Sequence, residues 1–181
     1  MIDFYFDREL KLKDLLDDGD LVFLTDNGWK WYGLKEYPEK TAIALFTSDD
    51  GYFTFGCGHD AALPVAFHLY EKKGIKFHDN LDLSWLDSVC EAYTIDLSED
   101  EWNTIIEYTC LSHMKYYLNP GNSLYDRIER EIKECEPKYN EIMVRSGIDK
   151  IQKEEEKNRE QAKDWLERKT IINKEDNDLP F

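Results

Sequence analysis

The sequence has no long apolar run and no recognisable secretion signal. No stretch approaches the roughly 18 apolar residues that a membrane-spanning helix needs. The first ten residues, MIDFYFDREL, lack a basic region followed by an apolar one. We therefore expect a soluble, cytoplasmic protein that makes no contact with membranes.

Cysteines are few and show no paired spacing. The 181 residues contain four of them, Cys57, Cys90, Cys110 and Cys135. In a protein without a secretion signal, such cysteines are expected to be free thiols rather than disulfides.

Basic side chains are also scarce. The chain has 39 acidic and 23 basic residues, a formal charge of −16, whereas its 41% hydrophobic and 14% aromatic content is typical of a folded protein. Residues 1–118 hold 23 acidic and 10 basic side chains, a net charge of −13, and residues 119–181 account for the remaining −3. The acidity therefore belongs to the front of the chain. A surface of this kind is a poor general ligand for phosphate backbones, because that attraction depends on Lys and Arg.

The first half of the chain reads as a small antiparallel sheet. Residues 21–25 and 29–32 flank Asn27-Gly28, a strong hairpin signal. Residues 41–47 and 52–55 form a second candidate hairpin around residues 48–51. From residue 60 onward the spacing of apolar residues becomes helical. We predict an α+β fold with a sheet of two hairpins, about four strands, covered by helices.

Helix signals divide the rest of the chain. Asp60 can cap a helix that ends at Gly74, and Ser98 with Glu101 forms a capping box. The sequence Asn-Pro-Gly-Asn at 119–122 is the best boundary. We predict an acidic α+β domain over 1–118, a long charged helical segment (a hairpin or broken helix) over 119–170, and a flexible acidic tail over 171–181. The apolar stripe of the helical segment can pack on its own domain or on a second copy, so the oligomeric state stays open.

Catalytic motifs are mostly absent. There is no glycine-rich phosphate loop, no G-x-S-x-G motif and no H-E-x-x-H motif. Cys57, His59 and Asp60 form the most enzyme-like cluster, because a thiol, an imidazole and a carboxylate can act as nucleophile and base. Residues so close in sequence rarely adopt that geometry, and a glycine turn with Asp60 as helix cap explains them as well. We expect no enzymatic activity.

A metal site is a second candidate. Cys110 and His113 lie one helical turn apart, and Cys57 with His59 would supply two further ligands. Because Cys110 and His113 also fall on an apolar helical line, a buried thiol and a core histidine explain them better. We expect no metal and no cofactor.

Trp29, Trp31 and Tyr32 are candidates for stacking on nucleic-acid bases. The alternation of Trp29 and Trp31 is equally typical of sheet packing. Stacking proteins also need a cationic groove, and this region offers few lysines against an acidic background. Direct binding would therefore be restricted to single strands.

The last six residues are Asp176, Asn177, Asp178, Leu179, Pro180 and Phe181. This end resembles the acidic tip of bacterial single-stranded-DNA-binding proteins, although Asn177 departs from the run of aspartates in that family. The resemblance covers these six residues only, and it implies docking onto replication, recombination and repair enzymes. Phe181 would enter an apolar pocket, its α-carboxylate would pair with a basic residue, and Asp176 and Asp178 would face a basic rim.

Charge and tail together suggest an interaction protein from a phage or mobile element. It would bind and modulate or inhibit a basic nucleic-acid-processing protein, as DNA-mimicking anti-restriction and anti-CRISPR inhibitors do, and its tail would mimic the single-strand-binding protein tip. The alternative is a replication or recombination accessory protein that binds single-stranded DNA itself.

Overall fold

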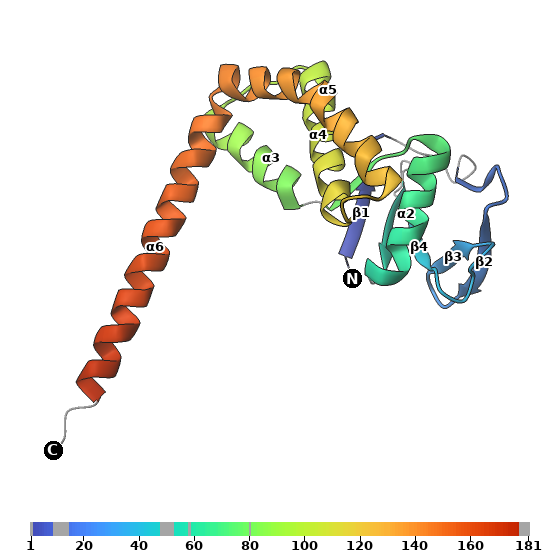
Figure 1. Cartoon of the computed structure of the whole chain (residues 1–181), viewed down its shortest axis with the longest axis horizontal. Coiled ribbons are helices and arrows are strands. Elements are labelled where there is room, and N and C mark those ends of the chain that lie inside the picture. The colour runs from blue at the N-terminus through green and yellow to red at the C-terminus, as the bar shows by residue number, and fades with distance from the viewer. Residues whose placement is uncertain (1, 9–14, 48–52, 58, 80, 178–181) are drawn as a thin grey trace. The chain divides into compact units, whose positions relative to one another are not determined.

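The computed structural model describes residues 2–8, 15–47, 53–57, 59–79 and 81–177 (Figure 1). The chain divides into two compact units, Met1–Tyr139 and Asn140–Phe181, and each is described by itself. No helix in the described residues is long and apolar enough to cross a membrane.

Six strands of the described residues form one antiparallel sheet in the first unit. They are β1 (Ile2–Phe6), β2 (Leu21–Asp26), β3 (Lys30–Leu34), β4 (Ile43–Thr47), β5 (Phe53–Cys57) and β6 (Phe77–Asp79). Their order is β2-β3-β4-β5-β1-β6, and every neighbouring pair is antiparallel. The α+β class and the antiparallel pairing within both predicted hairpins are confirmed, and the predicted turn at 48–51 lies outside the described residues. The sheet has more strands than the expected four because β1 and the three-residue β6 extend it beyond β5.

The β2–β3 hairpin turns through three residues, 27–29, between the paired residues Asp26 and Lys30. Gly28 has a φ of 95°, which L-residues rarely adopt, and its N–H donates to Oδ1 of Asp26 at 3.0 Å. The Asn-Gly signal therefore gives the right position for the turn. However, Trp29 belongs to the turn and not to the strand.

Four helices follow the first five strands. They are α2 (His59–Lys73), α3 (Leu81–Tyr93), α4 (Glu99–Tyr116) and α5 (Ser123–Ser146). The predicted capping box at α4 is confirmed, since Ser98 and Glu101 bond reciprocally. Gly74 follows α2 with a φ of 65°, and Gly121 lies between α4 and α5 with a φ of 92°. Pro137 lies inside α5 without ending it.

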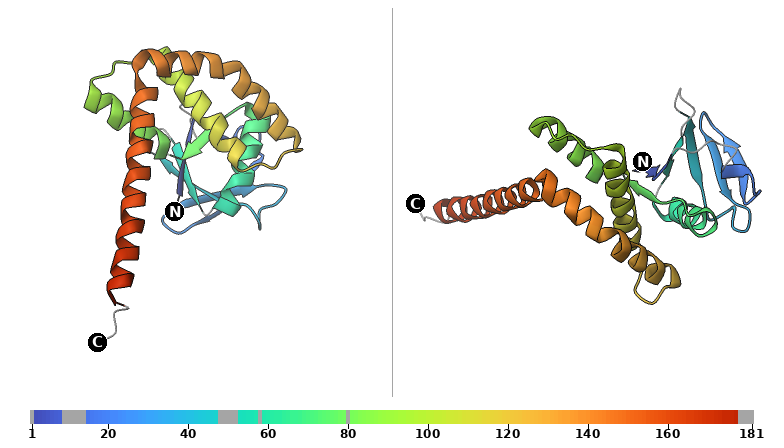
Figure 2. Two further views of the ribbon diagram at one scale, coloured as in Figure 1. Left: turned by 60° about the vertical axis from the view of Figure 1, so that its left-hand side comes forward. Right: turned by 90° about the horizontal axis from the view of Figure 1, so that it is seen from above.

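Helix α2 contacts β4 and β5, and its apolar side forms the core with the sheet (Figure 2). The largest fully buried side chains of this cluster are Phe4, Leu15, Ile43, Leu69, Tyr70, Phe77, Leu111, Met114 and Ile128. Because α4 and α5 contribute to the same core, the first unit continues to residue 139. It therefore extends beyond the division that the sequence suggests at residue 118.

The second unit contains the end of α5 and the long helix α6 (Ile148–Asn177). Gly147 separates the two helices with a φ of 77°. Pairs four residues apart, Lys153 with Asp149 and Arg159 with Glu155, lie along α6 at 3.5 and 3.7 Å. The helix runs to residue 177, so helical backbone continues into the segment 171–181 that the sequence suggests is a flexible tail.

Candidate functional site

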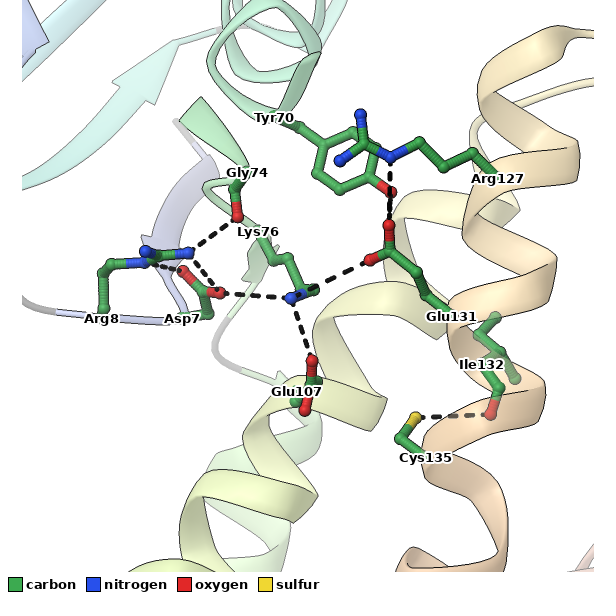
Figure 3. Close-up of polar contacts among 10 residues, drawn as sticks. All are labelled: Asp7, Arg8, Tyr70, Gly74, Lys76, Glu107, Arg127, Glu131, Ile132 and Cys135. Atoms are coloured by element: carbon green, nitrogen blue, oxygen red, sulfur yellow. Dashed lines mark hydrogen bonds and ion pairs between the residues drawn. The ribbon is translucent and has the colours of Figure 1, made fainter. Parts of the chain in front are cut away.

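Three carboxylates surround Lys76, which lies between α2 and β6 (Figure 3). The Nζ atom of Lys76 lies 3.0 Å from Glu107, 3.9 Å from Asp7 and 4.0 Å from Glu131. These carboxylates come from α4, from the residue after β1 and from α5. We call the four residues the Lys76 cluster. The side chains of Lys76 and Asp7 are only 13% and 9% exposed, whereas Glu107, the nearest partner of Lys76, is 46% exposed.

Glu131 also joins the cluster to α2. Its Oε1 accepts the hydroxyl of Tyr70 at 2.8 Å and Nε of Arg127 at 3.1 Å. The Arg127 guanidinium lies 4.5 Å from the centre of the Tyr70 ring. Burial and then the hydrogen bond to Glu131 raise the pKa of Tyr70 above its ordinary value. The phenol therefore stays protonated and donates to the carboxylate.

Two arginines next to the Lys76 cluster balance its charge. Arg8 bonds Asp7 through Nε at 3.1 Å and the carbonyl of Gly74 through Nη2 at 2.8 Å. Arg8, Lys76 and Arg127 thus face three carboxylates, those of Asp7, Glu107 and Glu131. An arrangement in which every charge has an opposite partner holds helices against the sheet, and it leaves no charge over for an anionic or cationic ligand.

The nearby thiols are not activated. Burial raises the pKa of Cys110 well above its ordinary value, and burial also raises the pKa of Cys135. The Sγ atom of Cys135 donates to the carbonyl of Ile132 at 3.4 Å. Neutral thiols such as the buried Cys110 and the half-buried Cys135 are weak nucleophiles.

The enzyme-like cluster of the sequence lies at a strand-to-helix connection. Cys57 ends β5, and His59 and Asp60 begin α2. The side chains of these three residues lie outside the part that the structure describes, so the expectation that they do not form a nucleophile and base stays untested.

The two helical metal-ligand candidates lie in the core of the first unit. His113 is enclosed by the rings of Phe4, Phe77 and Tyr117, and its Nδ1 lies 3.7 Å from Oδ2 of Asp79. Cys110 is fully buried. Within the described ranges, no group of three or more His, Cys, Asp and Glu side chains is arranged to hold a metal ion.

The three candidate stacking residues do not share one surface. Tyr32 is buried in the core, and the indole N–H of Trp31 donates to Oδ1 of Asn27 at 3.0 Å. Trp29 lies in the turn and is 47% exposed. Two aromatic residues that the sequence pattern did not single out, Phe23 and Tyr37, are exposed on the same hairpin and the loop after it.

The residues of the tail are described only in part. Asp176 and Asn177 are the last two residues of α6. The remaining four, Asp178, Leu179, Pro180 and Phe181, lie outside the described residues.

A strongly acidic segment was missed by the sequence prediction. Residues 77–114 contain nine acidic side chains and no Lys or Arg. We call this range, which covers β6, α3 and most of α4, the acidic segment. Four of its carboxylates are exposed and make no ion pair or hydrogen bond within the described residues: Asp87, Glu91, Asp96 and Glu99. A charge count in short windows would have found this segment, whereas the division at residue 118 averaged it with the hairpins.

Comparison with protein-family models, with curated proteins and with solved structures gives no match for this chain.

Proposed function

We propose that this chain is a non-enzymatic, cytoplasmic interaction protein that binds a basic nucleic-acid-processing protein and modulates or inhibits it. The observation that carries the proposal is the acidic segment, with nine acidic and no basic residues in 77–114. Clefts that bind DNA or RNA are lined with Lys and Arg, and such clefts attract an oppositely charged surface over long distances.

Exposed carboxylates on helices suit this role. Asp87 and Glu91 are exposed on α3 and lie one helical turn apart, a separation of about 6 Å along the axis. Asp96 and Glu99 continue the negative surface into the start of α4. Because folded helices hold Asp87, Glu91 and Glu99 in place, a basic cleft can bind these charges with little loss of conformational entropy. The acidic surface would compete with nucleic acid, as DNA-mimicking inhibitors from phages and mobile elements do.

The C-terminal residues support a second contact. Asp176, Asp178 and the apolar end Leu179-Pro180-Phe181 resemble the tip that single-strand-binding proteins use for docking. A peptide with acidic residues before an apolar end fits an apolar pocket with a basic rim. We propose that this tail occupies such a pocket on the same partner or on one associated with it.

An affinity experiment on a bacterial lysate tests the proposal. The full chain is immobilised, and nucleic-acid-binding proteins are identified in the eluate at about 50 mM and about 300 mM salt. A variant carrying Asp87→Asn, Glu91→Gln, Asp96→Asn and Glu99→Gln should recover at least fivefold less of the same proteins. A second variant without residues 179–181 should no longer recover the partner proteins that bind through the tail.

The matched control removes four exposed charges outside the acidic segment, by Asp17→Asn, Glu36→Gln, Glu39→Gln and Glu71→Gln. It should recover the partners as well as the wild type. If no nucleic-acid-binding protein is recovered, or if both fourfold variants lose the partners equally, the proposal is wrong.

A further inference from the structure

A second surface of the first unit carries three exposed aromatic side chains. Phe23 on β2, Trp29 in the β2–β3 turn and Tyr37 in the loop after β3 are 57%, 47% and 51% exposed. Single exposed apolar residues are common, but three within fifteen residues of one hairpin suggest a binding surface.

Unpaired lysines lie in the same stretch of the chain. Among the described Lys and Arg residues of 1–118, Arg8, Lys73, Lys76 and Lys115 take part in ion pairs. Lys30, Lys35 and Lys40 are exposed and make no ion pair in the part of the chain that the structure describes, and Lys72 on α2 is the fourth such residue. Three of these four unpaired lysines therefore lie in the hairpin and the loop that carry the exposed aromatic rings.

The backbone holds this surface in place. The N–H of Tyr37 donates to the carbonyl of Leu34 at 3.0 Å, and the carbonyl of Tyr37 accepts the hydroxyl of Thr41 at 2.8 Å. Phe23 packs edge-on against Tyr32 with ring centres 5.9 Å apart. The rings are thus carried by a hydrogen-bonded hairpin and a bonded loop rather than by a free chain.

The acidity of the whole protein does not dominate here. Residues 21–40 contain three acidic residues (Asp26, Glu36 and Glu39) and three lysines, so their net charge is zero. β2 is one edge of the sheet and β6, where the acidic segment begins, is the other. Five strand spacings separate these edges by about 24 Å, which is about one Debye length at 20 mM salt and more than two at 0.1 M. Figures 1 and 2 likewise show the β2–β3 hairpin and α3 on opposite sides of the first unit.

We propose that this hairpin surface, formed by Phe23, Trp29, Tyr37, Lys30, Lys35 and Lys40, binds short single-stranded nucleic acid. Half-exposed rings offer flat faces on which bases stack without a deep pocket, and the lysines pair with phosphates. An acidic peptide would form ion pairs with the lysines, but it has no planar groups that could stack on the aromatic rings. Strand β3 with its flanking residues provides room for about four nucleotides, at the lower end of known site sizes.

Fluorescence anisotropy of a labelled 12-nucleotide dT strand, titrated with the full chain at about 20 mM salt, tests this proposal. We expect saturable binding that weakens with salt, with a slope of log K against log salt of about −2 for three phosphate contacts. The double variant Trp29→Ala/Tyr37→Ala should bind at least about fivefold more weakly. The control Tyr93→Ala/Tyr116→Ala removes two exposed rings elsewhere in the first unit and should bind like the wild type.

Charge variants test the lysines separately. Lys30→Gln/Lys35→Gln/Lys40→Gln should weaken binding and flatten the salt dependence, whereas Lys72→Gln should change neither. Glu36→Gln/Glu39→Gln should strengthen binding, because it gives the surface a net positive charge. Circular dichroism confirms that each variant is folded.

Three results would overturn the proposal: no binding at about 20 mM salt, unchanged affinity of Trp29→Ala/Tyr37→Ala, or an equal loss in the Tyr93/Tyr116 control. Displacement of the strand by polyglutamate at equal charge concentration would assign the surface to acidic peptides instead. None of these results bears on the acidic segment, so the two proposals fail independently.

Discussion

Gly33 lies within β3 where the loop between β3 and β4 approaches closely. A Cβ atom at this position would lie 2.5 Å from the carbonyl oxygen of Thr41. Thr41 cannot easily move away, because its Oγ1 accepts the N–H of Leu34 and donates to the carbonyl of Tyr37, both at 2.8 Å. We expect Gly33→Ala to lower the free energy of unfolding by about 2 kcal/mol in urea denaturation. The exposed Lys30→Ala on the same strand should change it by less than about 0.5 kcal/mol, and equal stability of both variants would contradict the close approach.

Tyr70 should give the fold a specific dependence on alkaline pH. Its pKa in the folded chain is raised above the ordinary value of about 10, by burial and by the hydrogen bond to Glu131. The protonated phenol therefore stabilises the fold fully below pH 10, and this contribution is lost as pH rises toward the folded pKa. At pH 8, Tyr70→Phe should be about 1 kcal/mol less stable than the wild type. Urea denaturation at pH 8, 10 and 11 should show this difference shrinking, and a constant difference would contradict the assignment.

Lys76 links separate secondary-structure elements, because its three carboxylate partners follow β1 or lie on α4 and α5. Replacement by Met would leave Asp7 paired with Arg8 and Glu131 paired with Arg127, but it would remove the cation that connects them and the nearest partner of Glu107. We expect Lys76→Met to lower the free energy of unfolding by about 1 to 3 kcal/mol, less than the usual result of breaking a fully buried ion pair. Lys76→Arg should retain most of the stability, and the exposed Lys72→Met should have almost no effect. A loss below about 1 kcal/mol in Lys76→Met would mean that the cluster does not hold these elements together.

Elements defined by local signals were predictable from the sequence. Asn27-Gly28 located the first hairpin, and Ser98 with Glu101 located the start of α4, because a turn or a cap depends on residues only a few positions apart. The three-residue β6 was not predictable, since so short a strand has no measurable alternation. Its pairing with β1 comes from chain segments more than 70 residues apart.

The candidate sites depended even more on distant contacts. The Lys76 cluster joins residues 7, 76, 107 and 131, and no sequence spacing connects them. The stacking residues were only partly predicted, because neighbours in a strand point to opposite faces and Trp29 lies outside β3. Phe23 is exposed because it lies on the edge strand of the sheet, and Tyr37 is exposed because it lies in a loop. The spacing of aromatic residues in the sequence predicts neither position.

At the scale of the whole molecule, the negative charge is unevenly distributed. The Lys76 cluster is neutral only together with Arg8 and Arg127, the residues 21–40 are neutral in sum, and the acidic segment has a net charge of −9 over 38 residues. Two surfaces with different preferences can therefore exist on one folded unit. We propose a basic protein as the ligand of the acidic segment and a single nucleic-acid strand as the ligand of the hairpin surface.

The dissociation constant of the recovered partner, measured against salt concentration, tests the central claim most directly. We predict that affinity for the wild type falls steeply between about 50 and 300 mM salt. The variant lacking the charges of Asp87, Glu91, Asp96 and Glu99 should bind more weakly with a flatter salt dependence. The control lacking those of Asp17, Glu36, Glu39 and Glu71 should follow the wild-type curve. Superimposable curves for all three proteins would contradict the claim that the acidic segment is the docking surface.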